Sequence, residues 1–520
     1  MTSITHHRDK KTGTVYVYSV ESYWDKEKKA PRNKQVCLGK LDPETGEVIP
    51  SKRRRKIAER AVSAPGVSVT SRVAGPFLLL EELTGKHGIR GLLKKCFSED
   101  YEFILSLVYY IVHKGAALSR AETWGASCLH PFGKAISSQR ISELLARLSE
   151  DERQHFLALW LERVQENDWL CYDITSVSSY ARHNEYTQFG YNRDGDSLKQ
   201  INLAMLFGQK SRLPAHYRRF PGSISDVSTL KTTVKSLDYL GAGGMHFVLD
   251  RGFYSLANID ELFARKHKFT IALPTGRKWI RKLLDKHCDK IASPASYVMV
   301  GEDEALYVAS EFYKWGKKRH RSWVHIFYNA ERAACDFDRF TRQLIRCRVK
   351  LLAGQSVDDV DDDLRRYLIV KETPKRGLQV KFNEDEIRNS RKKYCGFFCI
   401  LSNEIKDANE ALRVYRDKDV VENCFDDLKN HMDMKRLRVH TAPTMDGRLF
   451  LQFLALIYVS SIRAEIRKNE KLKHLTVRRV MEEMETLVEI KYANRYGQVF
   501  TETTPTQRRI MKLFGVELPT

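Results

Sequence analysis

Two aspartates lie where strand-like apolar runs could bring their carboxylates together. Asp173 lies inside the run WLCYDITSVSSY, and by strand alternation it shares one face with three neighbours: Trp169, Cys171 and Thr175. Asp250 directly follows HFVL and precedes Arg-Gly-Phe, so the pattern predicts that it stands at the C-terminal end of a buried strand. The two carboxylates can converge if these strands are neighbours.

A third acidic candidate lies in the segment YRDKDVVENCFDDLKNHMDM, which has the pattern of a helix. At about 100° per residue, four polar side chains fall in one narrow sector: Tyr415, Lys418, Glu422 and Lys429. An adjoining apolar sector can pack on a sheet: Val421, Cys424, Phe425, Leu428 and Met432. The sequence therefore predicts that Glu422 points at the strand ends, with the two lysines beside it to contact phosphates.

Three carboxylates in this arrangement suit phosphodiester chemistry. That chemistry needs charge neutralisation and in-line geometry, which two Mg²⁺ ions roughly 4 Å apart can supply. Mg²⁺ prefers oxygen ligands and keeps several waters, so Asp173, Asp250 and Glu422 with phosphate oxygens would suffice, and Mn²⁺ is an expected substitute. Taken singly, however, an aspartate in a strand or a glutamate on a helix is more often structural or solvated, so these residues alone leave the function open.

The spacing of the polar residues on the predicted helix carries a family resemblance. Tyr415, Lys418, Glu422 and Lys429 follow the pattern Tyr, two residues, Arg, three residues, Glu, six residues, Lys. This resembles the YREK signature of the DDE transposases of bacterial insertion sequences, specifically insertion-sequence family four. Lys418 stands where the family has Arg, which keeps the charge but not the bidentate phosphate contact.

The two aspartates fit the same resemblance. Asp173 in DIT and Asp250 in DRGFYS resemble the family's first two acids, and PGSISDVSTL resembles the stretch between them, with Asp226 not expected to bind metal. The resemblance implies that Asp173, Asp250 and Glu422 are the catalytic metal ligands. It also implies a set of DNA-binding residues: Tyr415, Lys418, Lys429, Arg251 and, by base stacking, Trp315 or Trp323.

The resemblance further implies an α/β fold with an RNase H-like (retroviral-integrase-like) catalytic core. Such a core is a mixed five-stranded sheet flanked by helices, with the first Asp on strand one, the second after strand four and Glu on a later helix. A strand-rich insertion often precedes that helix. The implied reaction has water nick the transposon end, after which the freed 3′ hydroxyl attacks another phosphodiester.

Changes of pattern along the chain predict six segments. They are a basic strand-rich module at 1–60 that ends in SKRRRK, a helical DNA-binding region at 61–165, a first core part at 166–274, an insertion at 275–410, a second core part at 411–470 and a helical tail at 471–520. For the helical region, simple packing without DNA contact remains an equal alternative.

Composition limits the partners. The 520 residues include 88 Lys and Arg against 66 Asp and Glu, a net charge of +22, which favours a polyanion such as DNA. The longest apolar stretch, 449–462, is shorter than a membrane helix needs, so it is predicted to be a core helix, and no membrane is expected. Ten scattered cysteines form no zinc pattern, and the N-terminus lacks a secretory signal, so a bacterial cytoplasmic protein is expected.

The resemblance implies a transposase that binds the terminal inverted repeats of an insertion sequence and target DNA, as a homodimer or larger synaptic complex. Two alternatives stay open. An RNase H-like nuclease would have the same metal core without strand transfer. A repressor derived from a transposase would keep the basic segments without catalysis, although the intact acidic residues argue against it.

Overall fold

Five strands from the first part of the expected core lie side by side in one mixed sheet. Their order is β8 (Pro214–Pro221), β7 (Gln200–Gly208), β6 (Trp169–Ser179), β9 (His246–Leu249) and β10 (Lys268–Leu273). The first three are antiparallel neighbours, whereas β9 runs parallel to β6 and β10 runs parallel to β9. The parallel strands are reached by crossover helices, α8 (Asp226–Tyr239) and α9 (Leu256–Ala264).

This computed structural model describes residues 2–25, 30–50, 69–164, 168–181, 184–240, 243–300, 304–354, 356, 362–374, 377–492 and 497–517. The basic run SKRRRK at 51–56 lies outside the described residues. The chain divides into two compact units, residues 1–71 with 490–499 and residues 72–489 with 500–520. The acidic candidates all lie in the second unit.

Strands from the expected insertion extend the same sheet beyond β10. In order they are β16 (Phe397–Ser402), β13 (His320–Tyr328), β12 (Ala305–Trp315) and β11 (Tyr297–Met299), and with β17 (Arg436–Leu437) on β6 the described residues contribute ten strands. A hairpin of β14 (Leu368–Thr373) and β15 (Gly377–Phe382) stands apart beside α11 (Ala330–Leu352). Shorter helices complete this region: α10 (Lys278–His287), η3 (Pro294–Ser296), α12 (Asp362–Arg365) and α13 (Glu384–Tyr394).

Opposite faces of β6 pack on different helices because successive side chains alternate. The Tyr172 hydroxyl bonds Thr229 and Thr233 of α8, whereas Cys171 lies within hydrogen-bond distance of Gln209, which also bonds the Val414 carbonyl. The second face, which carries Asp173, is therefore covered by the segment after β16. That segment comprises α14 (Ala408–Arg416), α15 (Asp419–Asp426) and the π-helical turn η5 (Asp427–His431).

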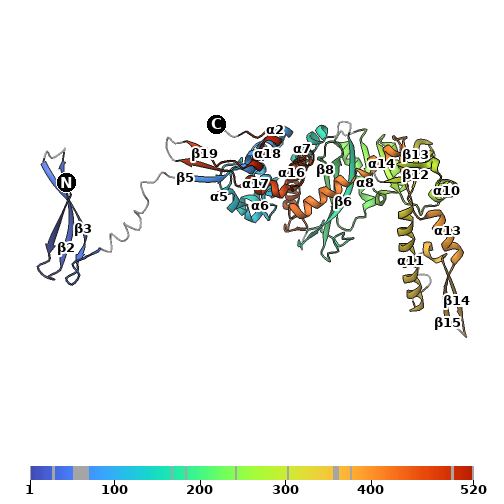
Figure 1. Ribbon diagram of the computed structural model, residues 1–520, viewed down its shortest axis with the longest axis horizontal. Helices are drawn as coiled ribbons and strands as arrows, with labels where there is room; N and C mark the ends of the chain where they lie inside the picture. The colour runs from blue at the N-terminus through green and yellow to red at the C-terminus, as the bar shows by residue number, and fades with distance from the viewer. Residues whose placement is uncertain are drawn as a thin grey trace. The chain divides into compact units, whose positions relative to one another are not determined.

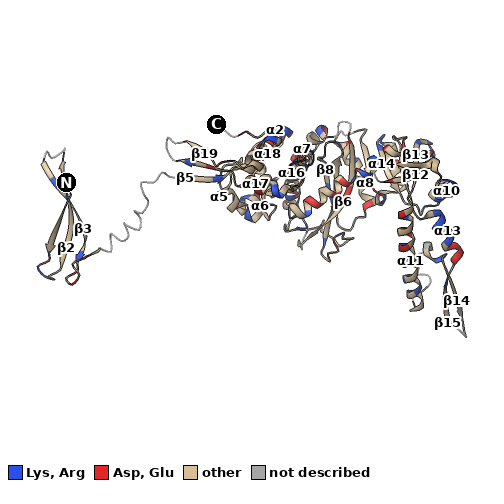
Figure 2. Ribbon diagram, viewed as in Figure 1, with Lys and Arg blue, Asp and Glu red and all other residues tan. Residues whose placement is uncertain are grey.

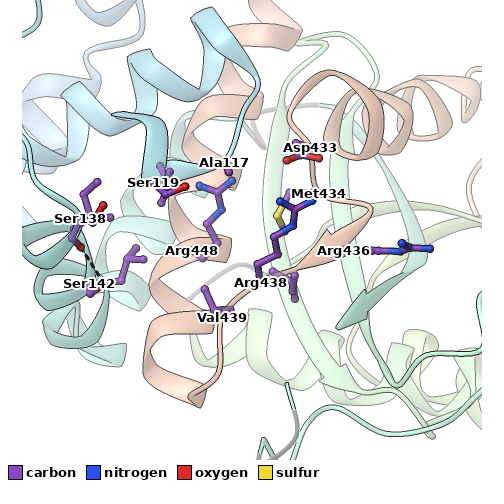
Figure 3. Close-up of a pocket in the computed structure, with 14 residues that line it drawn as sticks. Ala117, Ser119, Ser138, Ser142, Asp433, Met434, Arg436, Arg438, Val439 and Arg448 are labelled. Atoms are coloured by element: carbon purple, nitrogen blue, oxygen red, sulfur yellow. Dashed lines mark hydrogen bonds between the residues drawn. The ribbon is translucent and has the colours of Figure 1, made fainter. Parts of the chain in front are cut away.

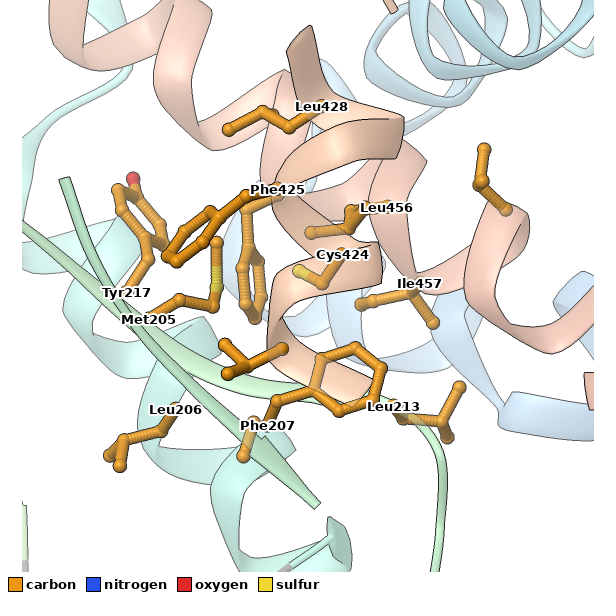
Figure 4. Packing of buried hydrophobic residues seen from close by; sticks show 14 of the residues in the cluster. Met205, Leu206, Phe207, Leu213, Tyr217, Cys424, Phe425, Leu428, Leu456 and Ile457 are labelled. Atoms are coloured by element: carbon orange, nitrogen blue, oxygen red, sulfur yellow. The ribbon is translucent and has the colours of Figure 1, made fainter. Parts of the chain in front are cut away.

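Apolar packing fixes α15 against the sheet. Figure 4 shows Cys424 and Phe425 facing Met205 and Phe207 of β7, with Leu456 of α16 (Ala442–Arg467) behind them. These side chains are buried, and each large one stabilises the packed state by about 1.5–3 kcal/mol. The helix that carries Glu422 is thus held against the strands by the apolar sector that the sequence predicts to pack on a sheet.

One helix among the described residues, α16, is long and apolar enough to cross a membrane, and 83% of its most apolar window is buried inside the protein. It lies beside β8 and helices of the N-terminal half (Figure 1). The prediction of a buried core helix at 449–462 is confirmed.

The region expected to be helical at 61–165 contains α2 (Gly75–His87), α3 (Ile89–Cys96), α4 (Tyr101–Lys114), η1 (Leu118–Arg120), α5 (Ala121–Ser127), α6 (Ser138–Arg147) and α7 (Glu150–Val164). Within described residues the smaller unit has a sheet in the order β1 (Thr2–Arg8), β2 (Val15–Asp25), β3 (Ala30–Leu41), β4 (Val48–Pro50). Lys and Arg are spread along the chain (Figure 2).

The C-terminal tail differs from the helical tail that the sequence suggested. Between α17 (Val477–Glu485) and α18 (Pro505–Phe514), two short strands form, β18 (Val488–Tyr492) and β19 (Gln498–Phe500). They join β5 (Val69–Val73) in a sheet of order β19-β18-β5. The partner strand lies over 400 residues away in sequence, so periodicity within the tail did not reveal it.

Candidate active site

Asp173 and Asp250 lie on neighbouring parallel strands. The register pairs Tyr172 with Leu249, the residues immediately before the two aspartates. Neighbouring strands are about 4.8 Å apart. Asp250 directly follows β9 and is extended, before the turn η2 (Arg251–Phe253). On this side of β6, pairing with β9 stops at Tyr172 and pairing with β17 begins at Ser178. Asp173 is therefore the first residue of the stretch of β6, 173–177, that has no strand partner on this side.

The Asp173 side chain is half-buried on β6. Its Oδ1 accepts a hydrogen bond of 2.7 Å from the backbone N–H of Ile174. Burial raises its pKa to about 6, a shift opposed by this hydrogen bond and by the charges of Arg193 and Lys418, and reinforced by Asp250. A carboxylate in such a place favours a nearby cation.

Asp250 is held by a tyrosine on the facing helix. The Tyr415 hydroxyl, on α14, donates a 2.7 Å hydrogen bond to Asp250 Oδ1. Burial and the negative charge of Asp250 raise the pKa of Tyr415 far above its ordinary value, so the hydroxyl stays protonated and donates. This contact fixes the rotamer of the second aspartate.

The single helix predicted over the YREK-like residues is wrong. The chain is interrupted between α14 and α15, where the Lys418 N–H bonds the Tyr415 carbonyl and the Val421 N–H bonds the Lys418 carbonyl. Asp419 begins α15, where a negative charge interacts favourably with the helix dipole. Spacing calculated for one straight helix therefore does not hold across this break.

Lys418 bonds Glu422 and interacts electrostatically with the two aspartates despite the break. Its Nζ donates to Glu422 Oε1 at 2.7 Å. Burial alone would lower the pKa of Lys418, but this hydrogen bond and the charges of Asp250, Glu422 and Asp173 raise it overall. One ammonium group is thus the shared electrostatic partner of all three acids, and the Glu422 side chain remains 56% exposed.

Lys429 lies in η5 and has a different partner from the one predicted. Its Nζ bonds both Asp194 oxygens, at 2.8 and 2.7 Å, and its side chain is 10% exposed. The neighbouring Arg193 pairs with Asp226 at 2.5 Å and interacts electrostatically with Asp173. The loop after β6 therefore adds Arg193, which sequence reasoning missed; its signal was the basic residue in the turn-like NRDGD.

The remaining DNA-binding candidates lie in three settings. Arg251 is exposed in the turn after Asp250. Trp315 is 4% exposed and donates its ring N–H to Asp260 at 2.8 Å, so the structure contradicts the base-stacking role predicted for it. Trp323 on β13 is partly exposed, with the side chains of Arg321 and Lys406 over its ring.

The donor chemistry of the site suits a divalent cation. Two half-buried aspartates on adjacent strands and Glu422 on the facing helix offer hard oxygen ligands. The three acids also favour the positive charge of Lys418 near them. Within the described residues, no three His, Cys, Asp or Glu side chains are gathered closely enough to hold an ion. Glu422 is instead turned to Lys418.

Comparison with known proteins identifies the family. Residues 165–458 match the family described as Transposase DDE domain. The chain belongs to this family. The matched DDE domain spans β6 to most of α16, so it contains all three acidic candidates.

One similar solved structure is a cryo-EM structure of a piggyBac transposase synaptic complex with hairpin DNA. It shares 12% sequence identity with this chain, at a TM-score of 0.35, and the match covers 78% of this chain and 70% of that chain. No curated protein matches the sequence.

Proposed function

We propose that this DDE-domain protein cuts DNA at the ends of an insertion sequence and joins them to target DNA. Asp173, Asp250 and Glu422 would be its catalytic carboxylates. Two observations carry the proposal: Asp173 and Asp250 lie at the ends of paired stretches of two adjacent strands, and Lys418, which bonds Glu422, also interacts electrostatically with both aspartates. The Tyr415, Lys418, Glu422 and Lys429 spacing supports placing it in insertion-sequence family four.

The strand arrangement supports an RNase H-like core. Within the larger sheet, the order β8-β7-β6-β9-β10 has three antiparallel strands followed by two parallel ones, which fits the mixed five-stranded sheet that the resemblance implies. Asp173 lies on its first strand in chain order and Asp250 directly follows the fourth. The strands at residues 297–402 enter between the fifth strand and the Glu422 helix, where the family carries an insertion.

Asp173, Asp250 and Glu422 would hold divalent ions, which we propose to be two Mg²⁺ replaceable by Mn²⁺. Bound there, the metal would neutralise phosphate charge and activate the attacking oxygen. The protein's own groups prepare this site: the Tyr415 hydroxyl fixes Asp250, and the Ile174 N–H fixes Asp173. Lys418 supplies a positive charge beside the acids that suits a DNA phosphate.

Other residues would hold the DNA. Exposed Arg251 stands next to the second aspartate and can reach a backbone phosphate. Trp323, with basic groups over its ring, offers a partly exposed aromatic surface for a base. The net charge of +22 suits a polyanionic partner. We further propose that terminal repeats and target DNA are held by a homodimer or larger assembly in the bacterial cytoplasm.

The test is an in vitro reaction of the full chain with Mg²⁺, a DNA fragment carrying the inverted repeats that flank its gene, and a target plasmid. The proposal predicts nicks at the repeat ends followed by covalent joining to the plasmid, and no product in EDTA. Nicking without joining would make the chain a nuclease. Specific binding without either product would make it a repressor.

A further inference from the structure

A cavity of about 250 Å³ lies in the larger unit, residues 72–489 with 500–520, and none of the three acids lines it. It is lined by η1, α6, the segment 433–439 around β17, and the N-terminal half of α16 (Figure 3). In Figure 3 the Arg448 side chain extends from α16 towards Ala117 and Ser119. We call this cavity the Arg448 pocket.

Arg448 is an unusual arginine because it is buried without a partner. It is 7% exposed, makes no hydrogen bond or ion pair to any described residue, and its Nη1 is fully enclosed without an acceptor. Burial lowers its pKa to about 10, opposed by the negative charge of Asp433. Burying an unpaired charge costs several kcal/mol in general.

The neighbouring residues on α16 show that the unpaired state is local to Arg448. Asp446, two positions earlier, pairs with both Arg153 and Arg219. Gly447 touches α6 so closely that a Cβ there would lie 2.4 Å from the Leu145 carbonyl oxygen. The close helix contact holds this turn of α16 in place, so Arg448 is directed into the cavity by fixed backbone.

The lining of the pocket suits a phosphate group. Arg436 and Arg438 also line it, against one acid, Asp433, and Arg436 is already paired with Asp196. The hydroxyl of Ser119 at the wall can donate to an anion. A guanidinium presents paired donors that match phosphate oxygens.

We propose that the Arg448 pocket binds a phosphate of the DNA backbone, away from the bond that is cut. β17, whose Arg436 lines the pocket, pairs with Ser178 of β6, five residues beyond Asp173. That is roughly 17 Å of strand at about 3.3 Å per residue, the length of about five steps of duplex DNA. One DNA molecule can reach both places. The inference rests on the proposed function only in taking DNA as the polyanion.

The first test is the melting temperature of the free, full-length protein. Arg448→Met removes an unpaired buried charge, so its melting temperature should rise. Arg153→Met is the matched control: Arg153 is 8% exposed but paired with Asp446, and its loss should lower the melting temperature. A fall for Arg448→Met would show a structural role and overturn the proposal.

The second test is binding to a random-sequence DNA duplex across a salt series. Losing one phosphate contact should reduce the slope of log affinity against log salt by roughly 0.9 in Arg448→Met, while Arg448→Lys keeps most of it. Binding to random DNA suffices because a phosphate contact does not read bases. An unchanged slope in Arg448→Met overturns the proposal even if the wild-type chain cuts and joins DNA normally.

Inorganic phosphate separates DNA from a free anion as the source of the phosphate. At matched ionic strength, phosphate should raise the melting temperature of the wild type but not of Arg448→Met. Saturating duplex should abolish this increment. If the increment persists with DNA bound, the pocket holds a free anion and the proposal is wrong. Neither readout needs catalysis, so failed cutting by the wild type would count against the proposed function alone.

Discussion

Tyr415→Phe should weaken the second aspartate as a metal ligand without unfolding the protein. The change deletes the hydroxyl that donates to Asp250 Oδ1 at 2.7 Å. A hydrogen bond to a charged group contributes about 1.5–3 kcal/mol, and 1.4 kcal/mol corresponds to a factor of about ten. Removing a group that orients a metal ligand commonly lowers metal affinity or activity 10–100-fold.

The assay is DNA nicking by the full chain over a range of Mg²⁺ concentrations. We expect Tyr415→Phe to need roughly tenfold or more Mg²⁺ for half-maximal nicking, with DNA affinity in EDTA unchanged. Tyr110→Phe is the control, since its hydroxyl donates an equally short 2.7 Å bond to the Ala117 carbonyl, away from the acids. Identical Mg²⁺ curves for Tyr415→Phe and the wild type would refute the positioning role of Tyr415.

Three further results are expected. Lys429→Ala should reduce the slope of log DNA affinity against log salt by clearly less than the roughly one unit expected for the loss of a phosphate contact, because Lys429 is already paired with Asp194. A reduction by a full unit would mean that DNA displaces Asp194. Phe425→Ala should lower the free energy of unfolding by about 3–5 kcal/mol, whereas Phe312→Ala, at an exposed position, should change it by under about 0.5 kcal/mol. Equal losses for the two variants in a urea titration would contradict the packing of α15. Burial lowers the pKa of His216 to about 3, so the unfolded chain binds a proton there at higher pH than the folded chain, and stability falls as pH drops below about 6.5. The melting temperature of His216→Met should fall less steeply with pH, and an equally steep fall would exclude His216 as its cause.

The positions of the two aspartates could be predicted because they depend on local pattern. Alternation around Asp173 and the apolar run before Asp250 identified two strands, and the structure makes them neighbours. The apolar edge of α15 was likewise readable, since Cys424 and Phe425 pack on the sheet as expected. Local periodicity reports burial well, because burial decides which face of a strand or helix is apolar.

Features that depend on distant contacts could not be read from the sequence. Trp315 looked available among basic residues, but it is buried by contacts with Asp260 and Trp279, which come from other elements. Lys429 has the expected spacing, yet Asp194 of a loop over 200 residues earlier binds it. Arg448 directly precedes the apolar stretch 449–462, and its sequence neighbours did not show that it would be buried without an ion-pair partner.

We propose that Asp173, Asp250 and Glu422 form one metal-dependent centre for both cutting and joining. The most direct measurement compares Asp173→Asn, Asp250→Asn and Glu422→Gln with the wild type on intact and pre-nicked terminal-repeat DNA, with Mg²⁺ and a target plasmid. We expect all three variants to bind the DNA but neither to nick intact ends nor to join pre-nicked ones. Joining of pre-nicked ends at the wild-type rate by any of the three would contradict it.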